Sequence, residues 1–145
     1  MIMKLYTYFR SSASYRVRIA LNLKGLEAEH IPVHLVNNGG EQHSETFRRV
    51  NPGELVPALI EDDFTLTQSL SMIEYLEEKF PETPLLPKNL QQRALIRAFS
   101  LNIACDIHPL NNLRVLQYLS KTLNASDEQK TEWYRHWVVT GLKAL

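Results

Sequence analysis

Apolar and polar positions at the start of the chain follow two different periods. Residues 3–9 alternate with a period of two and are rich in aromatic side chains, which predicts a β-strand. Residues 12–24 carry apolar side chains at helical spacing, between serines that can cap a helix and Gly25, which can end one. The β-branched run 29–36 predicts a second strand, and Pro32 favours a sheet edge for it. We therefore expect a βαβ unit with parallel strands.

The middle of the chain is polar over residues 37–54 and then becomes apolar again. Within residues 55–69, two short apolar runs flank the turn-like residues 61–63, which predicts a β-hairpin after a loop. Residues 69–80 have apolar side chains at helical spacing, hydroxyl groups at the start and Pro81 just after the end. This pattern predicts a helix. The order of elements is then βαβ, loop, ββα.

A proline-rich segment, residues 81–88, separates this first part from a remainder that is helical in pattern. Residues 89–121 predict one long helix or two, and residues 127–145 predict another. The change in composition marks a domain boundary. We expect an α/β domain over residues 1–80, a linker over 81–88 and an all-helical domain over 89–145.

Charge and composition restrict the classes of partner. Sixteen Lys and Arg residues balance sixteen Asp and Glu residues, so the chain lacks the positive field that nucleic acid or an anionic membrane requires. No apolar run approaches the roughly 20 residues that span a bilayer, and the first residues lack the apolar core of a signal peptide. The single cysteine, Cys105, excludes an internal disulfide and lies in a helical apolar pattern, where we expect it to be packed. We therefore expect a cytoplasmic protein without nucleic-acid or membrane partners.

The histidines and the charged pairs of the sequence indicate no further binding or catalytic site. The histidines show no metal-ligand spacing, so no metal is expected; they are His30, His34, His43, His108 and His136. The basic pair Arg48-Arg49 and the acidic pair Glu77-Glu78 are interpreted as solvated faces of helices or loops.

Candidate chemistry is concentrated at the start of two predicted helices. Arg10, Ser11 and Ser12 follow the first strand directly, and Gln68 and Ser69 precede the helix over residues 69–80. A serine at such a position often does no more than cap the helix. A hydroxyl group beside a helix N-terminus can also stabilise a bound anion, such as a thiolate or a carboxylate. Two serines and an arginine exceed what capping requires, which favours the second interpretation for the first helix.

Pro57 interrupts the apolar run LVPAL, where its missing N–H would break a central strand ladder. A turn into the strand explains it, and from these residues alone an ordinary trans proline is favoured. If the bond is cis, the backbone of Val56 faces outward and can pair with an extended, peptide-like ligand.

Several motifs together resemble the glutathione transferase superfamily. Four motifs resemble the zeta class of this superfamily, the maleylacetoacetate and maleylpyruvate isomerases. These motifs are YFRSSASYRVRIALNLKG, NPGELVPALI, LTQSLSMIEYLEEKFP and IHPLNNLRVL. The similarity covers essentially the whole chain. The resemblance implies a thioredoxin-like N-terminal domain that binds glutathione. It also implies an all-α C-terminal domain that supplies the pocket for the second substrate, and a homodimer.

The resemblance also implies roles for individual residues. Ser11 would donate its hydroxyl hydrogen to the glutathione sulfur, assisted by Ser12. Val56, before a cis Pro57, would pair with the cysteinyl backbone of glutathione. Gln68 and Ser69 would hold the γ-glutamyl carboxylate.

Three further positions complete the expected site. Gln42 and Asn112 match other glutathione-contacting positions of the class. Arg10 is our own extension: a cation beside the thiolate could hold a carboxylate of a small dicarboxylate substrate.

The implied reaction is a cis–trans isomerisation in the breakdown of tyrosine or other aromatic compounds. Glutathione thiolate adds to the cis double bond of a maleyl substrate, the new single bond rotates, and elimination yields the fumaryl isomer. The alternatives are conjugation or dehalogenation of small electrophiles, and a glutathione-binding or interaction module without turnover. A thiol-disulfide oxidoreductase is disfavoured, because position 11 is not cysteine and no Cys-x-x-Cys motif occurs.

The sequence departs from the zeta pattern in two respects. Ala13 stands where the class usually has cysteine, and Tyr15 stands where tryptophan is common. The chain also stops at WVVTGLKAL, inside the expected helical domain, so we expect a truncated C-terminal domain in either a fragment or a shortened protein. In a shortened protein, apolar faces of the helical domain would be exposed.

Overall fold

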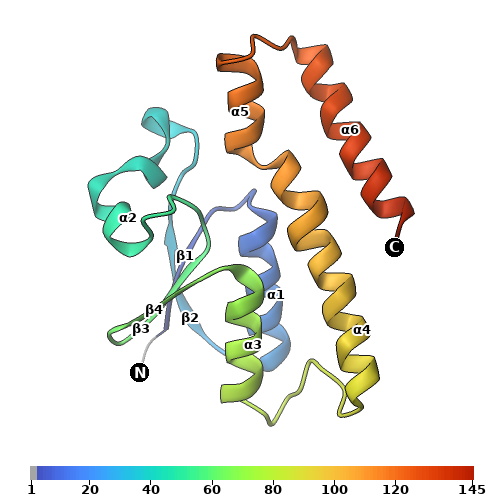
Figure 1. Cartoon of the computed structure of the whole chain (residues 1–145). Coiled ribbons are helices and arrows are strands. Elements are labelled where there is room, and N and C mark those ends of the chain that lie inside the picture. The colour runs from blue at the N-terminus through green and yellow to red at the C-terminus, as the bar shows by residue number, and fades with distance from the viewer. Residues whose placement is uncertain (1–2) are drawn as a thin grey trace. The chain divides into compact units, whose positions relative to one another are not determined.

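The computed structural model describes residues 3–145 and contains a four-stranded sheet and several helices (Figure 1). The chain divides into two compact units, Met1–Leu86 and Pro87–Leu145. The first unit is a thioredoxin-like α/β fold and the second is helical, as the sequence predicted.

The sheet of the first unit has the order β2-β1-β3-β4. Strand β1 pairs in parallel with β2 and antiparallel with β3, and β3 pairs antiparallel with β4. The predicted βαβ unit and the predicted hairpin are both confirmed. The strands are β1 (Met3–Thr7), β2 (Ala28–Pro32), β3 (Ala58–Glu61) and β4 (Phe64–Thr67).

The edge strand β2 is shorter than its β-branched run suggested, because it ends at Pro32 instead of residue 36. Pro32 is paired opposite Thr7 at the last position of the ladder, where its missing N–H costs no bond. Beyond it, Nδ1 of His34 accepts the backbone N–H groups of Val36 (3.3 Å) and Asn37 (2.9 Å). These bonds turn the chain away from the sheet.

Helices α1 (Ser12–Lys24) and α3 (Ser69–Lys79) pack together against the sheet and enclose the main core (Figure 1). Each helix begins beside a serine and ends near its predicted position. Gly25 ends α1 in the left-handed conformation (φ 67°), which glycine adopts without steric cost. The core consists of side chains with little or no solvent exposure: Met3, Leu5, Val17, Leu21, Leu59, Met72 and Leu76.

The polar segment 37–54 is not simply the loop that we expected, because it contains the short helix α2 (Glu45–Val50). Ser44 caps this helix by accepting the N–H of Phe47 at 3.2 Å. Phe47 is the apolar anchor of α2, and it packs in a second cluster with Tyr8, Val33 and Val56. A helix of six residues with one deeply buried side chain has too little periodicity to be recognised in the sequence.

The second unit consists of three helices joined by an irregular stretch: α4 (Leu90–Leu101), α5 (Leu113–Lys121) and α6 (Asp127–Lys143). The predicted helical region 89–121 is therefore two helices. Between them lie a π-helical turn, Asn102–Ile107, and a 3-10 turn, His108–Asn111, in which Pro109 cannot continue an α-helix. Helix α6 packs on this stretch, where Nε1 of Trp133 donates to the carbonyl of Leu110 at 2.8 Å.

One acid of the pair interpreted as solvated is in fact buried. The Nζ of Lys24, whose side chain has no exposed surface, lies 2.8 Å from Oε2 of Glu77, which is 8% exposed. Lys24 also donates to the carbonyls of Phe80 and Thr83, and the Glu77 carboxylate accepts the N–H groups of two linker residues, Leu85 and Leu86. The expectation for Glu77 was wrong because its partners come from distant parts of the chain. Burial alone would raise the pKa of Glu77, but Lys24 and the backbone N–H groups hold it below its usual value.

Three further observations concern Cys105, membrane-spanning helices and metal-binding groups. Cys105 is exposed, not packed as we expected, and it lies in the π-helical turn. In the part of the chain that the structure describes, no helix has the length and apolar character needed to cross a bilayer. Over the same residues, no three His, Cys, Asp or Glu side chains are grouped so that they could hold a metal ion.

Candidate functional site

The sheet register brings the predicted site residues of the first unit to one edge. Tyr6 of β1 pairs opposite Ala58 of β3, and Ala58 in turn pairs opposite Thr67 of β4. The end of β1, the start of β3 and the end of β4 therefore lie side by side. The segments that continue from these strand ends carry Ser11, Val56 and Gln68, so residues far apart in the sequence converge at this edge.

Ser11 occupies the N-cap of α1, with an extended backbone (φ −78°, ψ 114°). Its Oγ accepts the N–H of Ser14 at 3.1 Å, which leaves its own hydroxyl hydrogen for donation to another group. Ser12 is the first residue of the helix and is exposed. Capping and anion binding are thus compatible at Ser11, because they use different atoms of the same hydroxyl group.

The peptide bond between Val56 and Pro57 is cis, so the conditional prediction from the sequence applies. Among the described residues, the backbone N–H and C=O of Val56 have no hydrogen-bond partner. The Val56 side chain is buried in the cluster with Phe47. This position offers one donor and one acceptor to an extended ligand at the edge of the sheet.

The N-terminus of α3 combines an unusual backbone with a cation. Gln68 has a positive φ of 71°, which is uncommon for a residue with a side chain. Ser69 is 6% exposed, and its Oγ accepts a hydrogen bond of 3.0 Å from Nη1 of Arg16. The free N–H groups of the helix and the guanidinium group together make a positive environment suited to a carboxylate.

Arg16 is a residue that the sequence analysis missed. It lies on α1, 53 positions from Ser69, and its position on that helix carries no local sign of a binding role. Only the packing of α1 beside α3 brings the guanidinium group to the start of α3.

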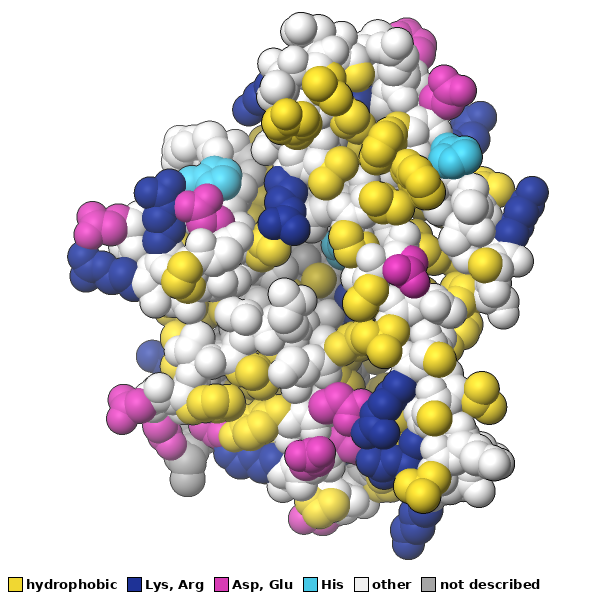
Figure 2. All heavy atoms as spheres, viewed as in Figure 1, with side chains coloured by type: hydrophobic (Ala, Val, Ile, Leu, Met, Phe, Trp, Pro, Cys, Tyr) yellow, Lys and Arg dark blue, Asp and Glu magenta, His cyan; other side chains and the backbone are white. Residues whose placement is uncertain are grey.

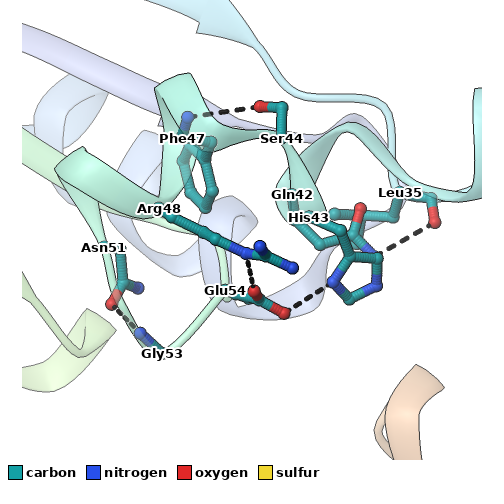
Figure 3. Close-up of polar contacts among 9 residues, drawn as sticks. All are labelled: Leu35, Gln42, His43, Ser44, Phe47, Arg48, Asn51, Gly53 and Glu54. Carbon is teal, nitrogen blue, oxygen red and sulfur yellow. Dashed lines mark hydrogen bonds and ion pairs between the residues drawn. The ribbon is translucent and has the colours of Figure 1, made fainter.

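Gln42, in the 3-10 turn Glu41–His43, is buried. Its Nε2 donates to the carbonyl of Leu35 at 3.3 Å and lies 3.1 Å from Nε2 of His43 (Figure 3). Nδ1 of His43 in turn lies 2.6 Å from a carboxylate oxygen of Glu54, whose other oxygen pairs with Arg48. Hydrogen bonds from His43 and Arg48 hold the pKa of Glu54 below its usual value.

Two predicted residues lie outside this group. Arg10 is exposed in the short segment between β1 and α1. Asn112 belongs to the second unit, where it is the N-cap of α5 and its Oδ1 accepts the N–H of Arg114 at 3.2 Å. Their roles toward a substrate and toward glutathione stay predictions.

Comparison with known proteins gives a consistent result. Residues 5–84 match the family described as the glutathione S-transferase N-terminal domain. A probable maleylacetoacetate isomerase of Vibrio cholerae is 53% identical over 141 residues, which cover 97% of this chain and 66% of the relative. A solved bacterial maleyl pyruvate isomerase of the zeta class has a TM-score of 0.92 at 43% identity and covers 97% of this chain and 66% of that one.

A third comparison includes bound ligands. The maleylacetoacetate isomerase of Methylobacterium extorquens AM1, solved with malonate and GSH, has a TM-score of 0.92 at 42% identity, covering 97% of this chain and 65% of that chain. The chain belongs to the zeta class of the glutathione S-transferase family. It spans about two thirds of the length of these zeta-class relatives, 66% of the Vibrio protein and 65% of the Methylobacterium protein.

Membership of the zeta class explains the order of the elements but does not by itself assign the side chains. The structure adds residues to the candidate site at two of the positions that the resemblance identified. Arg16 joins Ser69 at the start of α3, and His43 and Glu54 join Gln42. Ala13, which replaces the usual cysteine, is the second residue of α1 and leaves the capping role of Ser11 unchanged.

Proposed function

We propose that this chain binds glutathione and uses it as a cofactor in the cis–trans isomerisation of maleylacetoacetate or maleylpyruvate to the fumaryl isomer. One observation carries the proposal. A hydroxyl donor at the start of α1, the unpaired backbone of Val56 and the positive N-terminus of α3 converge at one edge of the sheet. These groups match the thiol, the peptide backbone and a terminal carboxylate of a short peptide.

The binding mode follows from the chemistry of each group. The γ-glutamyl carboxylate would lie at Gln68 and Ser69, where Arg16 adds a positive charge. The cysteinyl backbone would pair with Val56, as an added strand pairs with a sheet edge. This places the sulfur near Ser11 and Ser12. Gln42 and Asn112 would provide further contacts to glutathione.

The chain then has two tasks during the reaction, which are to stabilise the thiolate and to hold the substrate. The hydroxyl of Ser11 and the N-terminus of α1 stabilise the thiolate, and each unit by which they lower the thiol pKa corresponds to ~1.4 kcal/mol. The thiolate forms a C–S bond with one alkene carbon, and the π electrons move into the conjugated carbonyl to give an enolate. The remaining C–C single bond rotates, after which the enolate restores the double bond and expels the thiolate. Arg10 would hold a carboxylate of the substrate during this rotation.

The setting of this reaction is also part of the proposal. We place the protein in the cytoplasm, in the breakdown of tyrosine or other aromatic compounds, and as a homodimer. The names of the relatives support the reaction class, and the single exposed cysteine is compatible with a reducing compartment. Light scattering of the purified chain between about 1 and 100 µM, a range typical of weak to tight self-association, would test the dimer.

The deciding experiment is a glutathione-dependent cis–trans assay of the 145-residue chain on maleylacetoacetate and on maleylpyruvate. Ser11→Ala should lower kcat roughly 10- to 100-fold, the effect of losing a hydrogen bond to a charged group, while glutathione affinity changes little. Ser11→Thr, which keeps a hydroxyl group and a helix cap, should recover much of the loss. Ser71→Ala, at an exposed position on α3, is the matched control.

Each outcome has a clear interpretation. Unchanged turnover in Ser11→Ala would remove Ser11 from its assigned role. Glutathione binding without isomerisation would favour a binding module, and turnover only with halogenated or other electrophiles would favour a conjugating transferase. Absence of glutathione binding would refute the proposal.

A further inference from the structure

The turn before Val56 is built around one buried side chain. Asn51 is 8% exposed and follows the last residue of α2, where its N–H donates to the carbonyl of Phe47 at 2.8 Å. Its own carbonyl accepts the N–H of Glu54 at 2.9 Å, which closes a β-turn with Pro52 at the second position. Both backbone groups of Asn51 are therefore fixed, and they hold its side chain at the base of the turn.

The Asn51 side-chain amide bonds to two backbone groups of this segment. Its Oδ1 accepts the N–H of Gly53 at 2.9 Å (Figure 3), and its Nδ2 donates to the carbonyl of Leu55 at 2.7 Å. These partners settle which amide atom is the oxygen, because a backbone N–H requires an acceptor and a carbonyl requires a donor. A Cβ atom added at Gly53 would lie 3.1 Å from Oδ1, so the turn closes tightly on the amide.

The carbonyl of Leu55 belongs to the same peptide group as the N–H of Val56. This peptide bond is trans, since among the described residues the bond between Val56 and Pro57 is the cis one. In a trans peptide group the C=O and the N–H point in opposite directions within one plane. Because Asn51 holds the carbonyl, the Val56 N–H points away from Asn51, and it has no partner among the described residues. Asn51 thus sets the direction of this donor.

The same hydrogen bond also strengthens the donor. A carbonyl that accepts a hydrogen bond polarises its peptide group, and the N–H at the other end becomes more positive. The bond from Asn51 to Leu55 is at the short end of the normal range for N–H···O, and it lies in a largely buried part of the chain, where such polarisation is effective. Direction and strength of the Val56 N–H therefore depend on one side-chain amide.

We propose that Asn51 is a positioning residue for the Val56 N–H, and that it strengthens the hydrogen bond from this N–H to the cysteinyl carbonyl of glutathione. The proposal rests on the proposed glutathione site, in which Val56 pairs with the cysteinyl backbone. It adds a residue that acts on the ligand through a peptide group: the buried amide orients the group between Leu55 and Val56, and this group binds the tripeptide.

A merely structural role of Asn51 leads to a different expectation. If the amide only stabilises the turn, its loss displaces the whole segment and weakens every ligand of the site by a similar factor. If the amide positions the Val56 N–H, the loss falls on ligands that carry a cysteinyl carbonyl and spares ligands that lack it. Two ligands that differ at this carbonyl therefore distinguish the two roles.

The test is titration calorimetry of the 145-residue chain with two fragments of glutathione under reducing conditions. γ-Glutamylcysteinamide carries the cysteinyl carbonyl, whereas γ-glutamylcysteamine lacks it and keeps the γ-glutamyl group and the thiol. The ratio of the two affinities measures the contribution of the carboxamide group that distinguishes them. We expect this ratio to be roughly 3- to 10-fold smaller when Asn51 cannot donate to Leu55, the effect of one lost hydrogen bond.

Two variants remove the donor and keep an acceptor for the turn. Asn51→Asp retains an oxygen for the N–H of Gly53, but its carboxylate repels the carbonyl of Leu55. Asn51→Ser is uncharged and can accept from Gly53, as serine does in such turns, but its side chain is too short to reach Leu55. Asn38→Asp makes the first change at an exposed position of the 3-10 turn Asn37–Gly39 and should leave the ratio unchanged.

The outcomes distinguish this proposal from the proposed function. A wild-type ratio in both Asn51 variants, with glutathione still bound, would overturn the role of Asn51 and leave the glutathione site intact. Equal affinities of the wild-type chain for the two fragments would also overturn it, because the Val56 N–H would then gain nothing from the cysteinyl carbonyl. Absence of glutathione binding by the wild-type chain would refute both proposals.

Discussion

The two units of this chain bury their apolar side chains to very different degrees. In the first unit, short strands and two helices enclose a core in which Leu5, Val17 and Leu76 have no exposed surface. In the second unit, Ile107 is the one hydrophobic residue classed as buried among those described. The second unit instead exposes many large apolar side chains: Leu90, Leu95, Ile96, Phe99, Leu101, Tyr118, Leu123, Tyr134, Val139, Leu142 and Leu145.

The sheet accounts for the complete burial of apolar side chains in the first unit. Two helices laid on a sheet cover both its apolar face and their own apolar stripes, so short elements suffice. Helices joined by an irregular stretch cover one another only along narrow seams. Figure 2 shows apolar side chains gathered over α5 and α6, where Leu113, Leu116 and Tyr134 line an open groove. Stability in the first unit should therefore depend on single buried groups, and stability in the second should be spread over caps and surface contacts.

The largest effect should come from the buried ion pair of the first unit. Lys24→Met leaves the Glu77 carboxylate buried without its cation, and we expect the free energy of unfolding to fall by about 3–5 kcal/mol. The same change in the second unit, Lys130→Met, breaks a pair with Asp127, which is almost fully exposed, and should cost less than about 1 kcal/mol. Urea unfolding monitored by circular dichroism would measure both. Equal losses of unfolding free energy in the two variants would contradict the proposed difference between the two units.

Lowering the pH tests the same ion pair through protonation of Glu77. The pKa of Glu77 is lowered in the folded state, so its contribution to stability is present above the unfolded pKa of about 4.3 and is lost as pH falls through the lower folded value. Glu77→Gln should therefore differ most from wild type near neutral pH. In unfolding free energies measured from about pH 7 to pH 3, the difference between the two proteins should shrink as pH falls below the unfolded pKa and through the lower folded pKa. A constant difference over this range would show that proton binding by Glu77 does not contribute.

The next largest effect should come from the apolar core. Leu76→Ala removes a fully buried side chain from α3 and should cost about 2–5 kcal/mol, the transfer and cavity penalty. Leu95→Ala makes the same chemical change in α4 at a side chain that is 70% exposed, and should cost less than about 0.5 kcal/mol. Urea unfolding would give the two losses of unfolding free energy from the shifts in midpoint, provided that the m values are unchanged. A large loss in Leu95→Ala would mean that α4 packs more tightly than its exposure indicates.

How far the sequence could predict these elements depends on the distance over which each signal acts. The strands, the hairpin and the long helices were predicted from residue periodicity and from caps such as Ser11 and Gly25, which are local. Helix α2 was missed because Phe47 is its one deeply buried side chain. Glu77 was misinterpreted because nothing near it in the sequence indicates that Lys24 approaches from another helix.

A smaller effect should appear where α6 packs closely on Ile107. A Cβ atom on Gly141 would lie 2.3 Å from Cγ1 of Ile107, so Gly141→Ala should force these two segments apart at a cost of about 1–3 kcal/mol. Thr140→Ala, at the exposed neighbouring position, is the control. Hydrogen exchange of α6 amides would localise the loss to the second unit. Unchanged protection in Gly141→Ala would show that this contact does not hold α6.

The smallest expected effect concerns the start of α6. Ser126 and Gln129 form a capping box, in which each side chain bonds to the backbone of the other residue. Ser126→Ala should cost about 1 kcal/mol and increase exchange of the first-turn amides of α6. Glu132→Ala, exposed within the same helix, should have little effect. An equal loss in both variants would mean that helix propensity, not the cap, limits α6.

The candidate site divides in the same way between local and long-range signals. Ser11, Gln68 and Ser69 were found because helix starts are recognisable in the sequence, and Val56 was found because Pro57 interrupts a strand pattern. Gln42 and Asn112 came from the resemblance to the zeta class. Neither route identified Arg16, His43 or Glu54, whose partners lie elsewhere in the chain.

The sequence by itself determined the order of the elements and the residues placed at their ends, because periodicity, capping and proline geometry act within a few positions. The tertiary structure decided which of those ends meet. The register of β1, β3 and β4 brings Ser11, Val56 and Gln68 to one edge, and helix packing brings Arg16 to Ser69. These pairings depend on how elements distant in the chain are arranged in space, and that arrangement has no signature in any short stretch of residues.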